Sequence, residues 1–542
     1  MVRADFTSDD ERMRLVYYGL LLFILISAAF LRLLFVDQPF VDFISWRQAD
    51  DATIADNFFQ GHLNIFLPEI SWNGPGPNYV GYEFQLTTYL ASLLYHLFGK
   101  VDWVGRGISV VFGVWGIFAF HNLARRAFDK LTALVSCAVF AVMPGGIFVD
   151  RSFLPDPVMV SLVVTSFWML LAYLYDQRPR YLVLAVVTGT LGLLTKISGL
   201  IVGLPIVYAI LNLLPAGGAI RSRYLVRLIT AAILALIAVI GYYGWAIHVG
   251  HAYPPYLVAA SHNWIWNAGF YSWLKAYYFW LEFSWNARWL WTLPLLGLAL
   301  VGLLFLPAHR GRSGLRWLFH IWFLSGVIFY TFGAQELSIN AWNLHIVDPA
   351  LAGLAAQGLL VIAAMLGRLH LPLIGRVGVI LIIVVMHGFE MRHLRAVYRA
   401  HAQQSYRLGV ALARISQPSD LVITVANWIG DPVAIYYSQR RGWVFPPAWP
   451  GVDWTADIVD EPAAIQLFDR LRLNGAKWFG IVAEQRTKYH DTLPRLVAHI
   501  ESTTELVDRN HDWSIYRILP LKPESRLNER RSGWNRSGRT VT

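Results

Sequence analysis

Long apolar stretches separated by short polar segments are the feature that most constrains how this chain can fold. A helix of about 20 apolar residues is long enough to cross a bilayer. By that criterion the candidate spans are 15–36, 103–123, 131–149, 158–175, 181–195, 199–214, 228–247, 289–306, 317–334, 346–366 and 373–389. The sequence therefore predicts a mostly α, polytopic membrane protein with about 11 transmembrane helices.

Composition and charge agree with a membrane protein. Only 15% of the residues are charged, whereas a soluble domain has about 25%. The net charge of +10 does not indicate nucleic acid, because the basic residues form short clusters between apolar stretches. The one cysteine, Cys137, lies in an apolar run, which excludes an intrachain disulfide and a cysteine-rich metal site.

The arginine-rich loops predict the orientation in the membrane. Every second loop carries basic residues, and such loops face the cytoplasm. These residues are Arg3, Arg12, Arg14, Arg125, Arg126, Lys130, Arg178, Arg180, Arg221, Arg223, Arg227, Arg310, Arg312, Arg316, Arg368 and Arg376. We therefore expect a multi-pass protein of the bacterial plasma (inner) membrane, with a cytoplasmic N-terminus. Counting 83–98 as a span would reverse the later loops, so this segment is predicted to be an amphipathic helix at the outer interface.

The same pattern divides the chain into four parts. Residues 1–14 form a cytoplasmic N-terminus, and residues 15–390 form the membrane domain with a large first outer loop, 37–102. Residues 391–520 are predicted to form an extracytoplasmic α/β domain, with strands at 421–426, 478–483 and 513–519 and helices at 461–473 and 489–501. Residues 521–542 are predicted to be a basic, disordered tail.

The first outer loop contains two adjacent carboxylates beside an arginine, Arg47, Asp50 and Asp51. This combination at a membrane surface indicates a reactive site. The alternative is a solvated helix with both aspartates at its N-terminus, where the helix dipole favours negative charge.

Two further acids lie in outer-face segments. Glu83 lies at the start of the interfacial helix and has an alternative role as an ordinary acid of its first turn. Asp156 stands before Pro157, a favoured first helical residue, so it has an alternative role as an N-cap. Asp150 and Arg151 form a candidate structural pair.

Lys196 and His345 complete the set of candidate residues. Lys196 lies between two short apolar runs, where a charge costs a few kcal/mol unless it is solvated or paired. Its alternative role is a lysine that extends to the outer interface. His345 lies just before the tenth expected span, and a lone histidine of this kind is often structural.

All these candidates fall on the predicted outer face. A transporter instead places ionisable residues near the midplane of its helices, and we expect these midplanes to be almost empty. The pattern therefore favours an enzyme. A flippase or transporter of lipid-linked saccharides is the main alternative, and an assembly protein that binds a partner through 391–520 is a second.

The order of several short motifs resembles the glycosyltransferase C superfold. The resemblance covers about residues 15–390 and is closest to the protein O-mannosyltransferases and the lipid A aminoarabinose transferases. The motifs are Glu83-Phe84, Arg106-Gly107-Ile108-Ser109-Val110, Leu154-Pro155-Asp156-Pro157 and Leu194-Thr195-Lys196.

The resemblance implies an activity and a role for each residue. It implies an inverting glycosyltransferase that takes a sugar from a polyprenyl-phosphate donor to a hydroxyl on a protein, lipid or glycan. Asp50, or alternatively Asp51, corresponds to the catalytic acidic residue of the first outer loop, and Asp156 corresponds to that of the second.

The remaining roles concern substrate binding. Glu83 corresponds to the acid that opens the interfacial helix, and Lys196 corresponds to a contact of the donor phosphate. Arg47 and His345 are expected to balance charge on that phosphate. The carboxylates leave Mg²⁺ or Mn²⁺ binding open, because no ligand set is specified.

Overall fold

The computed structural model describes residues 8–61, 63–215, 217–257, 276–305, 315–337, 340–368, 378, 382–385, 388, 391–392, 394–453 and 456–520. Three of the predicted segments lie wholly or at least half outside the described residues. They are the basic tail 521–542, most of the span expected at 373–389 and half of the N-terminal segment 1–14.

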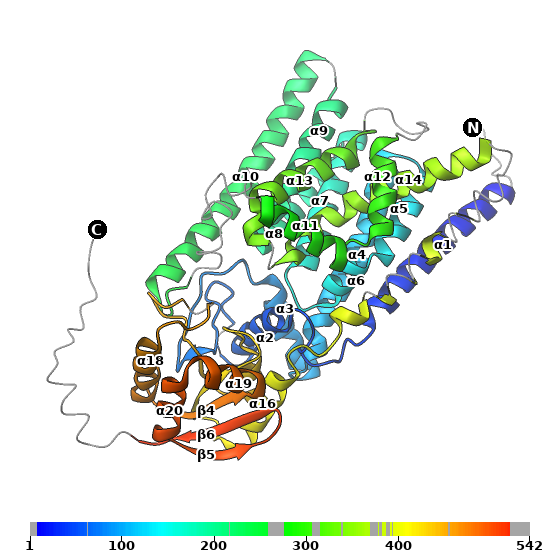
Figure 1. Cartoon of the computed structure of the whole chain (residues 1–542). Coiled ribbons are helices and arrows are strands. Elements are labelled where there is room, and N and C mark those ends of the chain that lie inside the picture. Colours follow the sequence, from blue (N-terminus) through cyan, green and yellow to red (C-terminus); the bar gives the residue numbers. More distant parts are fainter. Residues whose placement is uncertain are drawn as a thin grey trace.

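A body of apolar helices makes up most of the described chain (Figure 1). In chain order it contains α1 (Ser8–Leu33), α4 (Asp102–Ala127), α5 (Lys130–Val142), α6 (Pro144–Arg151), α7 (Asp156–Asp176), α8 (Pro179–Thr195), η1 (Ile197–Val202), α9 (Gly203–Leu213), α10 (Gly218–Ala252), α11 (Ala276–Trp289), α12 (Leu293–Leu304), α13 (Leu318–Leu337), η3 (Ala341–Val347) and α14 (Asp348–Arg368).

The described helices support a polytopic membrane protein, but they do not confirm eleven spans. Five are long and apolar enough to cross a bilayer: Glu11–Leu33, Asp102–Ala127, Asp156–Asp176, Ile220–Ala252 and Trp342–Arg368. A sixth span results if α5 and α6, which meet at a 64° bend, act as one. The bend occurs where Pro144 opens α6, since proline cannot continue the hydrogen bonds of α5. Four other expected spans are shorter apolar helices: Pro179–Thr195, Ile197–Leu213, Leu293–Leu304 and Leu318–Gly333.

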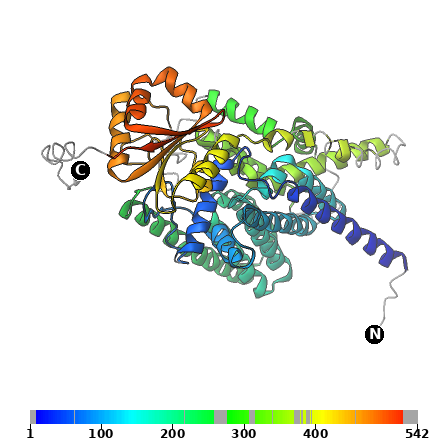
Figure 2. The same cartoon turned by 90° about the horizontal axis from the view of Figure 1, so that it is seen from below.

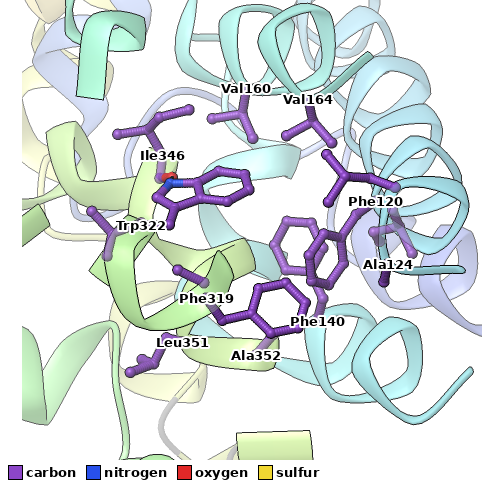
Figure 3. Packing of buried hydrophobic residues seen from close by; sticks show 14 of the residues in the cluster. Phe120, Ala124, Phe140, Val160, Val164, Phe319, Trp322, Ile346, Leu351 and Ala352 are labelled. Atoms are coloured by element: carbon purple, nitrogen blue, oxygen red, sulfur yellow. The ribbon is translucent and has the colours of Figure 1, made fainter. Parts of the chain in front are cut away.

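The centre of the helical body is a close-packed aromatic cluster (Figure 3). The Phe120 ring packs edge-on against Phe140, with centroids 5.5 Å apart, and contacts Phe319 at 5.8 Å. Trp322 is fully buried, and its indole N–H donates to the carbonyl of Ile346 at 3.1 Å. Interdigitated side chains of this kind hold helices α4, α5, α13 and η3 in one arrangement, because dispersion attraction requires close contact.

A small α/β domain lies at one end of the helical body (Figure 1). Its sheet has the order β1-β3-β2-β4-β6-β5, in which β2 is parallel to β3 and β4 while the outer pairs are antiparallel. Its elements are α16 (Gln403–Ile415), β2 (Leu421–Val425), α17 (Val433–Ser438), β3 (Gly442–Val444), α18 (Glu461–Leu473), β4 (Ala476–Val482), α19 (Ala483–Thr492), α20 (Pro494–Thr503), β5 (Thr504–Arg509) and β6 (Trp513–Ile518).

The sequence predicted much of this domain. Strands β2, β4 and β6 and helix α18 occur where they were expected. The single helix expected at 489–501 is wrong: α19 and α20 divide this region at Leu493, and Pro494 opens α20. Strands β3 and β5, which have three and six residues, were not predicted from the sequence.

The loop at residues 37–102, predicted to be the first outer loop and called the outer loop below, lies between the helical body and the sheet. It contains α2 (Ser45–Gln60), β1 (Asn73–Gly74) and α3 (Leu86–Phe98). Strand β1 pairs antiparallel with β3, so the loop contributes an edge strand to the sheet. The helix predicted at 83–98 is α3, which packs against α2 and α4. Figure 2 shows the sheet and the helical body from below.

Candidate active site

Helix α2 contributes one arginine and two carboxylates to a cluster that a third carboxylate, Glu83, completes. Because residues three and four apart share one face of a helix, Arg47 is a neighbour of both Asp50 and Asp51. Its Nη1 lies 3.1 Å from Asp50 Oδ2, and its Nη2 lies 3.4 Å from Asp51 Oδ1. The same Nη2 donates to Glu83 Oε1. The Arg47 cluster, defined as Arg47, Asp50, Asp51 and Glu83, thus joins α2 to the segment before α3.

These positions exclude two of the alternative interpretations. Helix α2 begins at Ser45, so Asp50 and Asp51 lie beyond its first turn. Both aspartates are 2% exposed and are not part of a solvated helix. Glu83 lies before Leu86, the first residue of α3, and is therefore not an acid of its first turn.

A strand-like segment of the outer loop holds a tryptophan against Asp50. The Trp72 indole N–H donates to Asp50 Oδ1 at 2.8 Å. Two backbone hydrogen bonds, from Ile70 to Asn78 and from Val80 to Pro68, close the loop segment that carries Trp72. Both oxygens of Asp50 therefore have a partner, Trp72 on one side and Arg47 on the other.

A lysine–carboxylate pair lies beside this cluster. Lys196 Nζ lies 2.8 Å and 2.9 Å from the two oxygens of Asp156. The backbone N–H of Phe84 donates to the carbonyl of Leu194 at 3.0 Å, which brings the segment of Glu83 to the end of α8. Lys196 is therefore paired, and Asp156 is not an N-cap, because Pro155 occupies that position of α7.

The Arg47 cluster and the neighbouring Lys196–Asp156 pair combine buried aspartates with partly exposed side chains. The side chains of Asp50, Asp51 and Asp156 are at most 3% exposed. Those of Arg47 and Lys196 are 14% and 19% exposed. Glu83 is also 14% exposed, so the side chains of this group that a ligand can reach are Arg47, Lys196 and Glu83.

Burial and the neighbouring groups affect the pKa values of the two aspartates differently. Burial raises the pKa of Asp50, while the charge of Arg47 and the Trp72 N–H act in the opposite direction. Burial raises the pKa of Asp51 well above its ordinary value, and the charges of Glu83, Asp50 and Asp156 raise it further against Arg47. Asp51 Oδ2 is buried without a hydrogen-bond partner. Asp50 thus has the better-stabilised anion.

His345 belongs to a different group of residues. Its Nε2 lies 2.9 Å from Asp150 Oδ1, and its Nδ1 lies 2.7 Å from Asp348 Oδ2. The guanidinium of Arg32 also binds Asp150, at 2.8 Å, and the Trp291 N–H donates to Asp348 at 2.7 Å. The side chain of His345 is 1% exposed, and among the described residues no hydrogen bond or ion pair joins it to the Arg47 cluster.

A second buried network of hydrogen bonds and ion pairs contacts α2 through Gln48. Asp42 Oδ2 accepts from Arg106 at 2.9 Å and from Arg151 at 2.6 Å. Gln48 of α2 donates to Asp42 Oδ1 at 2.6 Å and accepts from Arg106 Nε at 3.0 Å. The pairing of Asp150 with Arg151 is therefore wrong, because Arg151 binds Asp42 and Asp150 binds Arg32.

Among the ionisable residues of the two networks, Arg32, Asp42 and Asp348 were not predicted from the sequence. Arg32 and Asp348 are buried within the apolar runs expected to be spans. Their positions inside apolar runs were the available signal, because an ionisable residue in a membrane helix has a partner or a function. Arg106 stood in a family motif but was not assigned a role.

The described residues contain no group of three or more histidine, cysteine or acidic side chains arranged to hold a metal ion. In the Arg47 cluster the guanidinium already lies among the carboxylates.

Comparisons with known proteins agree with this architecture. Residues 85–245 match the family model of dolichyl-phosphate-mannose-protein mannosyltransferase, which covers less than half of the chain. No curated protein sequence matches the chain.

Two solved structures resemble the whole chain. One is ArnT from Cupriavidus metallidurans bound to undecaprenyl phosphate, with a TM-score of 0.61 and 14% identity, covering 92% of this chain and 98% of that one. The other is the Archaeoglobus fulgidus oligosaccharyltransferase in complex with Zn and sulfate, with a TM-score of 0.55 and 16% identity, covering 92% and 74%.

These likenesses confirm the resemblance to the glycosyltransferase C superfold that the motifs indicated. The chain has the fold of this group of multi-pass membrane proteins.

Proposed function

We propose that this chain is an inverting glycosyltransferase. It transfers a sugar from a polyprenyl-phosphate donor to an acceptor hydroxyl at the extracytoplasmic face of the plasma membrane. One observation carries the proposal: two buried aspartates with different environments, Asp50 and Asp51, lie beside the cations Arg47 and Lys196. The undecaprenyl phosphate bound to ArnT and the mannosyltransferase family model support a lipid-phosphate donor.

Asp50 acts as the general base. A base must be ionised before it accepts a proton, and Trp72 and Arg47 stabilise the Asp50 anion. The acceptor hydroxyl oxygen forms a bond with the anomeric carbon of the donor while its proton passes to Asp50. The bond from that carbon to the phosphate oxygen breaks, and the polyprenyl phosphate leaves with the electron pair. Attack opposite the leaving phosphate inverts the anomeric carbon.

Lys196 and Arg47 stabilise the leaving phosphate. Charge increases on the phosphate oxygens as the sugar bond breaks, and fixed cations stabilise that charge most when they are already in position. Asp156 holds the Lys196 ammonium through both carboxylate oxygens, while Glu83 holds Arg47. Asp156 and Glu83 are therefore positioning residues in this mechanism.

Asp51 has a complementary role. Burial and the neighbouring acids favour its protonated form, and a protonated carboxyl is a hydrogen-bond donor. Its buried Oδ2 has no partner in the protein, so this carboxyl is available to a sugar or phosphate oxygen. His345 is not part of this mechanism, because its ring is enclosed by Asp150 and Asp348.

The test is turnover of defined donors by the purified chain in lipid nanodiscs. Release of sugar from a panel of radiolabelled polyprenyl-phosphate sugars is compared for wild type, Asp50→Asn and Asp51→Asn. The Asp457→Asn variant is a matched control, because Asp457 is a 62% exposed surface carboxylate. Loss of a general base lowers the rate by about 10²-fold or more.

We expect that loss in Asp50→Asn and unchanged turnover in Asp457→Asn, with thermal unfolding unchanged in both. Full turnover in a folded Asp50→Asn protein would contradict the assignment of the base. Movement of a lipid-linked saccharide across the bilayer of sealed proteoliposomes, with no bond cleavage by wild type, would instead support the flippase alternative.

A further inference from the structure

A second candidate site lies where the outer loop meets the α/β domain. A cleft of about 430 Å³ is formed by residues 73–79 of the loop, the end of α10 and the sheet domain. Ligand pockets in proteins have volumes of about 300–1,000 Å³. The cleft is thus large enough for a small ligand or for part of a longer one, and the Arg47 cluster does not line it.

Aromatic side chains form much of the wall of this cleft. Tyr79, Tyr253, Trp443 and Trp449 all line it. The rings of Tyr79 and Tyr253 meet edge-on, with centroids 5.6 Å apart, and Tyr253 is 39% exposed. Trp443 is 1% exposed, so Tyr79, Tyr253 and Trp449 are the aromatic side chains that offer flat apolar surface to a ligand, with a polar group at the ring edge for hydrogen bonding.

The polar part of the wall consists of amides. Asn73, Asn78 and Asn474 line the cleft, and none of its described lining residues is charged. Asn73 is 6% exposed, and its Nδ2 donates to the carbonyl of Ala448 at 3.0 Å. Its Oδ1 is buried without a partner. A buried acceptor of this kind is costly unless a ligand or water donates to it.

The aromatic rings and amides of the wall indicate which class of ligand the cleft binds. An amide both donates and accepts hydrogen bonds, as a sugar hydroxyl does. The C–H faces of a pyranose ring pack on aromatic rings. The charged residues beside Gly76 of the wall, Arg441 and Glu69, form an ion pair with each other, so they leave no net charge to attract a phosphate or a basic peptide. A neutral saccharide matches all three properties.

The cleft and the Arg47 cluster are adjacent to the same short segment of the loop. Trp72, whose indole N–H binds Asp50, is the residue before Asn73. Consecutive side chains of an extended strand point to opposite faces. Trp72 therefore faces the Arg47 cluster while Asn73 faces the cleft, and only this strand lies between the two sites. Both sites therefore depend on the same short segment.

We propose that this cleft binds a neutral saccharide portion of the acceptor. That the saccharide is the acceptor rests on the proposed transferase activity, whereas the binding itself does not. The acceptor is then a glycan or a glycosylated molecule, held at a distance from the hydroxyl that reacts.

Direct binding tests this inference without turnover. Chitotetraose, maltotetraose and mannotetraose are titrated into the full chain in lipid nanodiscs, and saturation-transfer difference NMR detects bound sugar. A trigalacturonate and an unglycosylated serine-rich peptide are the comparison ligands. We expect saturable binding of at least one neutral tetrasaccharide and none of the comparison ligands.

Two variants and a matched control locate the binding. Removal of an anchoring aromatic side chain weakens binding about tenfold or more, so Tyr253→Ala and Trp449→Ala should lose that much affinity. Trp428→Ala should bind as wild type does, because Trp428 is 40% exposed in the same domain but does not line the cleft. Tyr253→Ala keeps the test valid if Trp449→Ala does not fold.

The outcomes separate the two proposals. Absence of binding by all three tetrasaccharides, binding of the peptide alone or wild-type affinity in Tyr253→Ala would overturn the cleft proposal. Saccharide binding that persists in Asp50→Asn is expected, since binding requires no base. Saccharide binding by a wild-type protein that turns over no donor would preserve the cleft as a saccharide site and overturn the transferase.

Discussion

Asp50 and Asp51 are adjacent in one helix, but their surroundings differ. Trp72 donates to Asp50 at 2.8 Å, whereas Asp51 has an oxygen with no partner. Two acids whose environments shift their pKa values by different amounts are the usual basis for separate acid and base roles. At the residue scale, burial and the charge of Arg47 act on both aspartates, whereas the indole N–H of Trp72 lowers the pKa of Asp50 alone.

Replacement of Trp72 by phenylalanine tests this role. The Trp72 N–H lowers the pKa of Asp50, so its loss raises that pKa and protonates the base at a higher pH. Because kcat/KM follows the ionisation of the free enzyme, we expect its rising limb to move to higher pH in Trp72→Phe. The pH profile of donor turnover is the measurement.

Trp115→Phe is the matched control for this shift. Trp115 also donates its indole N–H to a side chain, Thr165 at 2.9 Å, but it lies in α4. An unchanged limb in Trp72→Phe, or a shift to lower pH, would be inconsistent with Asp50 as the base.

At the element scale, glycines permit two helices of the body to pack backbone to backbone. A Cβ added at Gly302 of α12 would lie 1.9 Å from the carbonyl oxygen of Leu354 in α14. A Cβ added at Gly358 would lie 2.1 Å from the carbonyl oxygen of Leu298. Small residues at such crossings are typical of membrane helices, whose association depends on close packing.

Gly302→Ala should therefore destabilise the protein. The added methyl overlaps backbone atoms that cannot rotate away, and overpacking of this kind costs about 1–3 kcal/mol. We expect a lower unfolding temperature in detergent, measured by the fluorescence of the native tryptophans.

Gly297→Ala in the same helix is the control. No atom lies within 4 Å of a Cβ added there, and alanine favours a helix over glycine by about 1 kcal/mol. Its unfolding temperature should stay the same or rise. Equal losses in both variants would show that the α12–α14 contact is not the cause.

At the scale of the whole molecule, the outer loop connects the helical body to the sheet domain. One buried cluster contains Phe58 and Trp72 of the loop together with Leu408, Val422 and Trp478 of the C-terminal domain. Since β1 also extends the sheet, the loop and the domain must lie on the same side of the membrane.

Labelling of introduced cysteines tests the predicted orientation. In a Cys137→Ala background, a membrane-impermeant maleimide should label Lys477→Cys in intact spheroplasts, because residues after 390 are expected outside. Arg178→Cys should react only after permeabilisation, because its loop is expected in the cytoplasm. Both positions are exposed, Lys477 with 64% of its side chain. The reverse pattern of labelling would overturn the orientation.

The sequence by itself determined the membrane class, the resemblance to the superfold and the segments that carry the Arg47 cluster. Apolar stretches and short motifs are local properties, so their residues can be recognised without knowing their neighbours. Arg47, Asp50 and Asp51 lie within one turn of a helix, and that spacing already places them together. The pairing of Lys196 with Asp156 was not predictable, because 40 residues and two helices separate them.

Only the tertiary structure decided the partners of buried charges and the construction of the sheet. His345 binds Asp150, 195 positions away, and Asp42 binds both Arg106 and Arg151. A buried charge must find an opposite charge, but several candidates satisfy that need in the sequence. Strand β1 is two residues long and pairs with β3 some 370 positions later. Such a short segment has no periodicity of its own, so its structure comes from the strand beside it.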